Sequence, residues 1–98
     1  MDFATWQQLL AVSGDRMPQP FRSGSELMLT ITEELGEVAK EVAQLEQVGS
    51  KVTWEREPSV ERLGEEMTHL LNVIGLLANF YKIDLNTIYT AKTTQNEL

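Results

Sequence analysis

The sequence predicts an all-α domain built on two long helices, and two observations carry this prediction. Apolar residues recur every three or four positions along two segments, residues 25–48 and 59–81, which is the spacing of a single helix face. No segment alternates apolar and polar residues in the way a half-buried strand does. Since 98 residues suffice for one small domain, we expect residues 1–98 to form a single helical domain.

The first predicted helix is short and begins at Asp2, whose carboxylate can accept hydrogen bonds from the free backbone N–H groups of the first turn. Its apolar residues share helical spacing: Phe3, Trp6, Leu9 and Leu10. Gly14 is expected to end this helix. Residues 13–24 contain two Gly, two Pro and two Ser, and therefore predict a loop.

Each of the two long helices is preceded by a serine that can cap it. Ser23 or Ser25 can cap the second predicted helix, which ends near Gly49. Ser59 can cap the third, and residues 49–58 form the connecting loop. The apolar stripe of the second helix consists of Leu27, Ile31, Leu35, Val38, Val42 and Leu45. That of the third consists of Leu63, Met67, Leu70, Ile74, Leu77 and Tyr81.

Further apolar residues widen the stripe of the third helix until most of its circumference is apolar: Leu71, Val73, Leu76, Ala78 and Phe80. A helix of this kind is buried by several neighbours, which a chain of this length can hardly supply alone. We therefore expect a helical bundle of two long antiparallel helices, completed by oligomerisation into a homodimer or homotetramer. Asp84 can cap a last short helix, which runs from Leu85 to about Asn96.

The charge balance and composition exclude several classes of partner. The chain carries 8 basic and 15 acidic residues, for a net charge of −7. Binding to a nucleic-acid backbone or an anionic membrane needs a basic face, so we expect neither partner. The absence of cysteine excludes disulfides and thiolate metal sites. Without a signal-like segment or an apolar run long enough to span a bilayer, the chain is expected in the cytoplasm.

Six of the seven net negative charges come from residues 33–66, and some of these carboxylates lie beside apolar residues. At about 100° per residue, Glu34 and Glu37 share a stripe, and Glu34 borders the apolar face. Glu66 lies about 40° from the centre of the apolar face of the third helix, and His69 follows one turn later. Helical bundles hold metal ions with side chains that project inward in this way, and oxygen-rich ligation suits Mg²⁺ or Mn²⁺.

Solvation at the surface and pairing with other side chains are the alternatives to a metal site. Glu34 and Glu37 could belong to a solvated face with partners one turn away, such as Lys40. A buried Glu66 could instead pair with a basic residue or with His69, since an isolated carboxylate is costly to ionise in apolar surroundings. The sequence also leaves open whether Glu41 joins a metal site.

Two segments of the chain resemble the MazG-like all-α nucleoside triphosphate pyrophosphohydrolases. They are LTITEELGEVAKEV (residues 29–42) and ERLGEEMTHLLNVIGLLANFYKIDL (residues 61–85), and the resemblance extends from about residue 27 to residue 96. The family's pattern is ExxE followed, after a spacer, by ExxD. Glu34-x-x-Glu37 matches the first half, and Glu66-x-x-His69 matches the second except at its last residue.

The resemblance implies an enzyme that splits a nucleoside triphosphate into the monophosphate and pyrophosphate. Mg²⁺, or Mn²⁺ in its place, would be held by Glu34, Glu37, Glu66 and His69, with Glu37 and Glu66 as the catalytic residues and water attacking the α-phosphorus. Family members form dimers or tetramers.

Other residues are candidates for contacting the nucleotide. By the same resemblance, Lys92 and Asn96 in the last helix contact phosphates, although ordinary surface polarity also explains them. Trp54, in the loop before the third helix, could form an apolar wall for the base or simply anchor that loop.

The histidine at position 69 is the main departure from the family's pattern. Mg²⁺ prefers oxygen ligands, whereas imidazole suits Mn²⁺, Fe²⁺ or Zn²⁺. The metal preference has therefore shifted, or one metal site is weakened, or activity is lost. In the last case the chain would be a catalytically inactive relative that binds nucleotides or acts as a structural helical oligomer.

Overall fold

The structure is a computed structural model, and it describes residues 1–15, 23–49 and 57–97. These residues form four α-helices and no strand, so the prediction of an all-α fold is confirmed. The helices are α1 (Phe3–Asp15), α2 (Gly24–Glu46), α3 (Val60–Phe80) and α4 (Leu85–Thr94). None of these helices is both long enough and apolar enough to cross a membrane.

The helices begin where the sequence places a capping side chain. Ser23, rather than Ser25, caps α2, and its hydroxyl oxygen accepts a hydrogen bond from the backbone N–H of Glu26. Ser59 caps α3 in the same way. The carboxylate of Asp84 caps α4, where the hydroxyl and N–H groups of Thr87 donate to it and hold its pKa below the ordinary value. Because these hydrogen bonds join residues that are close in the sequence, the first residue of each of these helices can be predicted from the sequence.

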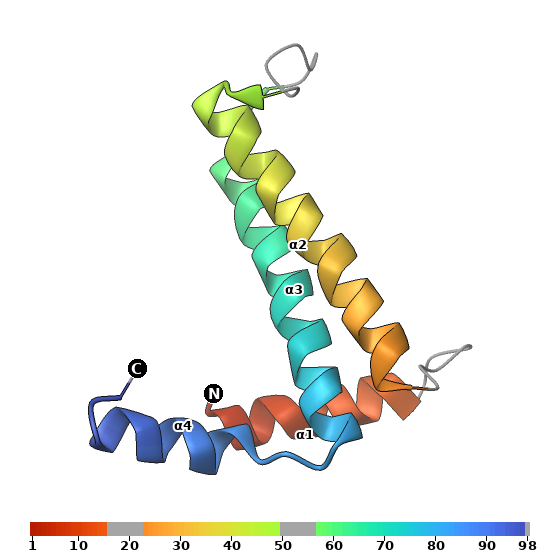
Figure 1. The fold of residues 1–98 in the computed structure, drawn as a ribbon, viewed down its shortest axis with the longest axis vertical. Helices are drawn as coiled ribbons and strands as arrows, with labels where there is room; N and C mark the ends of the chain where they lie inside the picture. The colour runs from red at the N-terminus through yellow and green to blue at the C-terminus, as the bar shows by residue number, and fades with distance from the viewer. Residues whose placement is uncertain (16–22, 50–56, 98) are drawn as a thin grey trace.

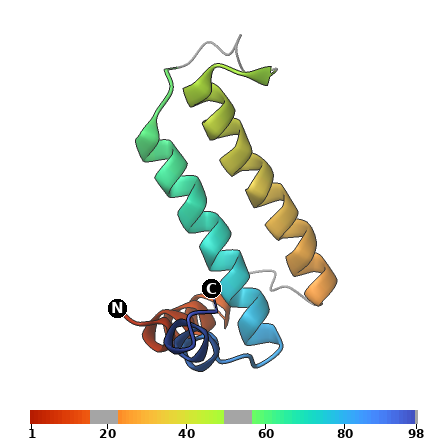
Figure 2. The same ribbon diagram turned by 60° about the vertical axis from the view of Figure 1, so that its left-hand side comes forward.

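Two of the helices form a long arm, and the other two lie across one end of it (Figure 1). The chain runs along α2 and returns along α3 beside it, as both views show (Figures 1 and 2). Helices α1 and α4 pack against each other at the end of the arm, where the rings of Phe3 and Tyr89 meet edge to face with centroids 5.0 Å apart. Helix α1 also packs on α3.

Hydrogen bonds of a buried glutamine connect α1 to the end of α3 and the start of α4. The side-chain amide of Gln7 donates to Asn79 Oδ1 and to the carbonyl oxygen of Ile83, both at 2.9 Å. Its carbonyl oxygen accepts from the backbone N–H of Leu85 at 3.0 Å. Since a buried amide with satisfied hydrogen bonds fixes its surroundings, Gln7 orients α1 on the rest of the chain.

Helix α1 packs closely on α3 at Gly75, and this contact gives a first prediction. A Cβ atom at Gly75 would lie 2.8 Å from the Trp6 ring and still closer to Leu10. Gly75→Ala is therefore expected to lower the free energy of unfolding by about 1–3 kcal/mol, measured by urea denaturation. Gly64→Ala in the same helix, where a Cβ meets nothing within 4 Å, should raise it by up to about 1 kcal/mol. Equal effects of the two substitutions would contradict this close approach.

The core of a single chain is small. Among the described residues, the buried apolar side chains are Leu10, Leu27, Val73 and Ala78. The sequence predicts an α3 surrounded by neighbours, but within one chain several apolar residues of α3 and its C-cap stay exposed: Val60, Met67, Leu71, Ile74, Phe80 and the C-cap Tyr81. The physical reason is that α2 covers one side of α3 and α1 covers only its last turns.

Candidate metal centre

The structure brings together three of the residues that the sequence singles out. Glu34 on α2 meets Glu66 and His69 on α3, and one potential ligand atom of each lies within 4.8 Å of the others. The Nδ1 atom of His69 is 3.5 Å from Glu66 Oε2 and 3.9 Å from Glu34 Oε2. We refer to these three residues as the Glu34 cluster. Their contact requires α2 and α3 to pack in one particular register.

The Glu34 cluster lies at the junction of α2 and α3 and opens to solvent on the histidine side. The side chains of Glu34 and Glu66 are 26% and 25% exposed, whereas that of His69 is 58% exposed. The side chain of Glu66 is thus partly shielded from solvent. It is less buried than the sequence predicts from the apolar residues around it on the helix. A solute can reach the cluster past His69.

The spacing and chemistry of the Glu34 cluster fit a divalent cation. Ligand atoms at about 2.0–2.3 Å from a metal ion lie up to about 4–4.6 Å from one another. The separations within the cluster come within a small side-chain rotation of this geometry. Two carboxylates and one imidazole suit Mn²⁺, Fe²⁺ or Zn²⁺ and also leave positions for water or a phosphate oxygen.

An ion pair between a buried carboxylate and a partly exposed arginine holds the register that brings these residues together. The carboxylate of Glu41, almost fully buried on α2, accepts from Arg62 Nε of α3 at 3.3 and 3.4 Å. Two turns before Glu41 lies Glu34, and two turns after Arg62 lies His69. One alignment of the two helices therefore satisfies both contacts. Glu41 belongs to this ion pair, and Glu34 to the cluster.

Removal of Arg62 is expected to destabilise the α2–α3 pair. Arg62→Met should lower the free energy of unfolding by about 2–3 kcal/mol, because buried Glu41 loses a guanidinium partner. Glu41→Met should cost less, since Arg62 is one-third exposed and still donates to the carbonyl oxygen of Glu57. Lys40→Met, which breaks the half-buried i,i+3 ion pair with Glu37, provides the control and should change stability by less than about 0.5 kcal/mol. Equal urea midpoints for Arg62→Met and Lys40→Met would refute this account.

The structure does not bring the other predicted site residues into the Glu34 cluster. Glu37, one turn beyond Glu34, pairs its Oε1 with Lys40 Nζ at 3.0 Å. On α4, Lys92 pairs with Glu97 at 3.2 Å. Asn96 follows α4 with a left-handed backbone, φ 55°. Trp54 lies outside the described residues.

Sequence reasoning did not assign the ion pair of Glu41 and Arg62, although a signal was available. Glu41 follows Glu34 by two turns, so both occupy the same face of α2. Arg62 stands where a capping-box acid would be expected at the start of α3. A basic residue at that place, one turn before Glu66, is explained by a partner on another helix.

Comparison of the chain with family models, with curated proteins and with solved structures finds no match in any of the three.

Proposed function

We propose that this protein is a metal-dependent nucleoside triphosphate pyrophosphohydrolase. It would hydrolyse an NTP or dNTP to the monophosphate and pyrophosphate by attack of water at the α-phosphorus. The observation that supports this proposal is the Glu34 cluster, in which two helices present two carboxylates and an imidazole at metal-ligand spacing. The resemblance of residues 29–42 and 61–85 to the MazG-like enzymes supplies the reaction.

Each residue of the site has a role in this proposal. Glu34, Glu66 and His69 hold a divalent cation, Mg²⁺ or Mn²⁺, which when bound neutralises charge on the phosphates. Glu37 is half-buried and lies one turn from Glu34. If Lys40 releases the carboxylate of Glu37, that carboxylate can accept the proton of the attacking water. Glu66 acts with it as a catalytic residue by fixing the cation and the phosphates relative to that water.

The proposal extends to the surroundings of the site. Lys92 and Asn96, at the end of the chain, would contact phosphates, and Trp54 would form part of the base pocket. The two long helices act as an antiparallel pair within a homo-oligomeric bundle in the cytoplasm.

A pyrophosphate-release assay tests the proposal directly. The purified protein is incubated with each of the common NTPs and dNTPs, first with Mg²⁺ and then with Mn²⁺. We expect release of pyrophosphate and monophosphate in equal amounts, abolished by a chelator. No turnover of any nucleotide with either metal would overturn the proposal.

The alternative is a catalytically inactive relative that binds nucleotides or serves as a structural oligomer. It is favoured by His69, whose ring already contacts both carboxylates of the cluster. Thermal melting with Mn²⁺ and a nonhydrolysable nucleotide separates the two roles, because a ligand that binds only the folded chain raises its melting temperature. A raised melting temperature without turnover would indicate a binding protein, and no change would indicate a structural one.

A further inference from the structure

Three helices surround an apolar hollow at the end of the arm, where α1 and α4 lie across α3 (Figure 1). The hollow has a volume of about 270 Å³. Each helix contributes to its wall, and the side chains include Phe3 and Trp6 of α1, Leu71 and Ile74 of α3, and Tyr89 and Lys92 of α4. An adjoining hollow of about 400 Å³ shares Phe3, Trp6 and Leu71 with it. We refer to the two hollows together as the α1–α3–α4 pocket.

Aromatic rings form much of the wall of this pocket and are held in fixed positions. The Phe3 ring lies 5.8 Å from the Trp6 ring at an angle of 56°, and 5.0 Å from the Tyr89 ring at an angle of 65°. Trp6 Nε1 donates a hydrogen bond to Asn72 Oδ1 of α3 at 3.4 Å, which orients the indole. Rings in tilted and edge-on contact favour the insertion of another flat ring beside them.

A lysine supplies the charge that selects the ligand. Among the described residues that line the smaller hollow, Lys92 is the only charged one. Its Nζ atom pairs with Glu97 at 3.2 Å, but both side chains are about half exposed, so another anion can replace Glu97. Asp2, in the wall of the larger hollow, accepts a hydrogen bond from the backbone N–H of Thr5. An anionic group is therefore expected at the Lys92 end of the pocket.

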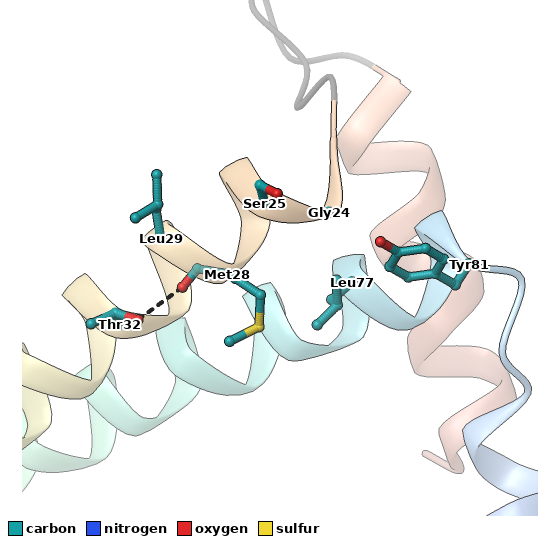
Figure 3. A pocket seen from close by; sticks show the side chains of 7 residues that line it. All are labelled: Gly24, Ser25, Met28, Leu29, Thr32, Leu77 and Tyr81. Atoms are coloured by element: carbon teal, nitrogen blue, oxygen red, sulfur yellow. Dashed lines mark hydrogen bonds between the residues drawn. The ribbon is translucent and has the colours of Figure 1, made fainter.

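A further hollow on the arm lacks this combination. It has a volume of about 480 Å³ and lies between the start of α2 and the end of α3, where Met28, Leu77 and Tyr81 line it (Figure 3). No charged side chain of the described residues lines it. The α1–α3–α4 pocket differs from it because an apolar, aromatic wall ends there at a cation.

We propose that the α1–α3–α4 pocket binds a small aromatic anion. The flat ring of the ligand contacts Phe3, Trp6 and Leu71, and its carboxylate pairs with Lys92. Binding sites for small molecules are concave and mostly apolar, have a few polar groups that orient the ligand, and enclose about 300–1,000 Å³. The two hollows lie near the lower end of this range, which suits a ligand of one or two fused rings.

Such a ligand would stabilise the position of α4. None of the residues of this helix is buried. Helix α4 packs on α1 through contacts such as that of Tyr89 with Phe3. A ligand that touches α1, α3 and α4 together adds contacts that only the docked position of α4 provides, so binding and docking of α4 support each other.

This site is distinct from the Glu34 cluster and goes beyond the proposed enzymatic function. At about 100° per residue, Leu71 lies about 160° from His69 around α3. The pocket and the Glu34 cluster therefore occupy opposite sides of that helix. Binding in the pocket needs neither metal nor nucleotide, so it can be measured whether or not the protein hydrolyses a nucleotide.

Calorimetric titration of the metal-free protein with 2-naphthoate, a two-ring aromatic carboxylate, tests the proposal. We expect one molecule bound per chain with a dissociation constant below about 1 mM. The neutral 2-naphthamide should bind at least about threefold more weakly, since it has no charge for Lys92. Lys92→Met should remove this difference. Lys82→Met, which removes a positive charge that lines neither hollow, should keep it.

A variant that fills the pocket locates the binding. Leu71→Trp should abolish detectable binding of 2-naphthoate, because Leu71 lines both hollows. Met67→Trp is the matched control: Met67 lies one turn earlier on α3, is 50% exposed against 52% for Leu71, and lines neither hollow. It should keep the wild-type affinity within about twofold.

Hydrogen exchange of the wild type covers the case in which Leu71→Trp does not fold. Saturating 2-naphthoate should slow exchange of the backbone amides of α4 at least about twofold and leave those around Glu34 on α2 unchanged. Absence of saturable 2-naphthoate binding to the wild type would overturn the proposal. Unchanged exchange in α4, equal affinities for 2-naphthoate and 2-naphthamide, or equal binding by folded Leu71→Trp and Met67→Trp would overturn it as well.

Discussion

Glu66→Gln is expected to reduce metal-dependent pyrophosphate release by about 10²–10³-fold. The substitution keeps the shape of the side chain but removes a negative charge from a cluster that holds three ligand atoms within 4.8 Å. Charge stabilisation by a bound cation amounts to several kcal/mol, and each 1.4 kcal/mol corresponds to a tenfold change in rate. Calorimetric titration with Mn²⁺ should show weaker binding in the same variant.

Glu65→Gln is the matched control for this prediction. Glu65 precedes Glu66 on α3, is exposed, and does not belong to the Glu34 cluster. It should keep the wild-type rate and Mn²⁺ affinity within about twofold, as expected for an isolated surface charge. If Glu66→Gln keeps its activity while circular dichroism shows a folded protein, the Glu34 cluster is not the catalytic centre.

The helices could be predicted because their signals are local. Ser23, Ser59 and Asp84 each accept a hydrogen bond from a backbone N–H three residues later, so a short window of sequence contains the whole interaction. The meeting of Glu34 with Glu66 follows from similar reasoning, since each borders the apolar face of its own helix.

The rest depends on contacts between residues far apart in the chain. The hydrogen bonds of Gln7 join residues separated by 72 to 78 positions, and nothing near Gln7 in the sequence indicates them. Glu37 shows a different limit. Helical spacing predicts that it lies beside Glu34, but Lys40, three residues away on the other side, forms an ion pair with it in the structure. The apolar width of α3 indicated burial, and only the packing shows that its own chain leaves that face uncovered.

His69→Asp is expected to change the metal preference of the Glu34 cluster. The wild-type donor set contains an imidazole nitrogen, which suits Mn²⁺ better than Mg²⁺, whereas a third carboxylate completes the all-oxygen set that Mg²⁺ prefers. We expect the ratio of the Mg²⁺-supported rate to the Mn²⁺-supported rate to rise at least about tenfold. The affinity for Mg²⁺, measured by calorimetry, should rise in parallel.

The same substitution should make the folded protein more dependent on metal. His69 Nδ1 lies 3.5 Å from Glu66 and 3.9 Å from Glu34, and an aspartate there adds repulsion between carboxylates in place of these contacts. Without metal, His69→Asp should therefore melt below the wild type, and saturating Mg²⁺ should raise its melting temperature more than that of the wild type. His69→Asn, which offers an oxygen without the charge, should show neither the metal-free loss of stability nor the full gain in Mg²⁺ affinity. If neither the aspartate nor the asparagine variant differs from the wild type in Mg²⁺ affinity, position 69 does not contribute a metal ligand, and its contacts with Glu34 and Glu66 only support the packing of α2 on α3.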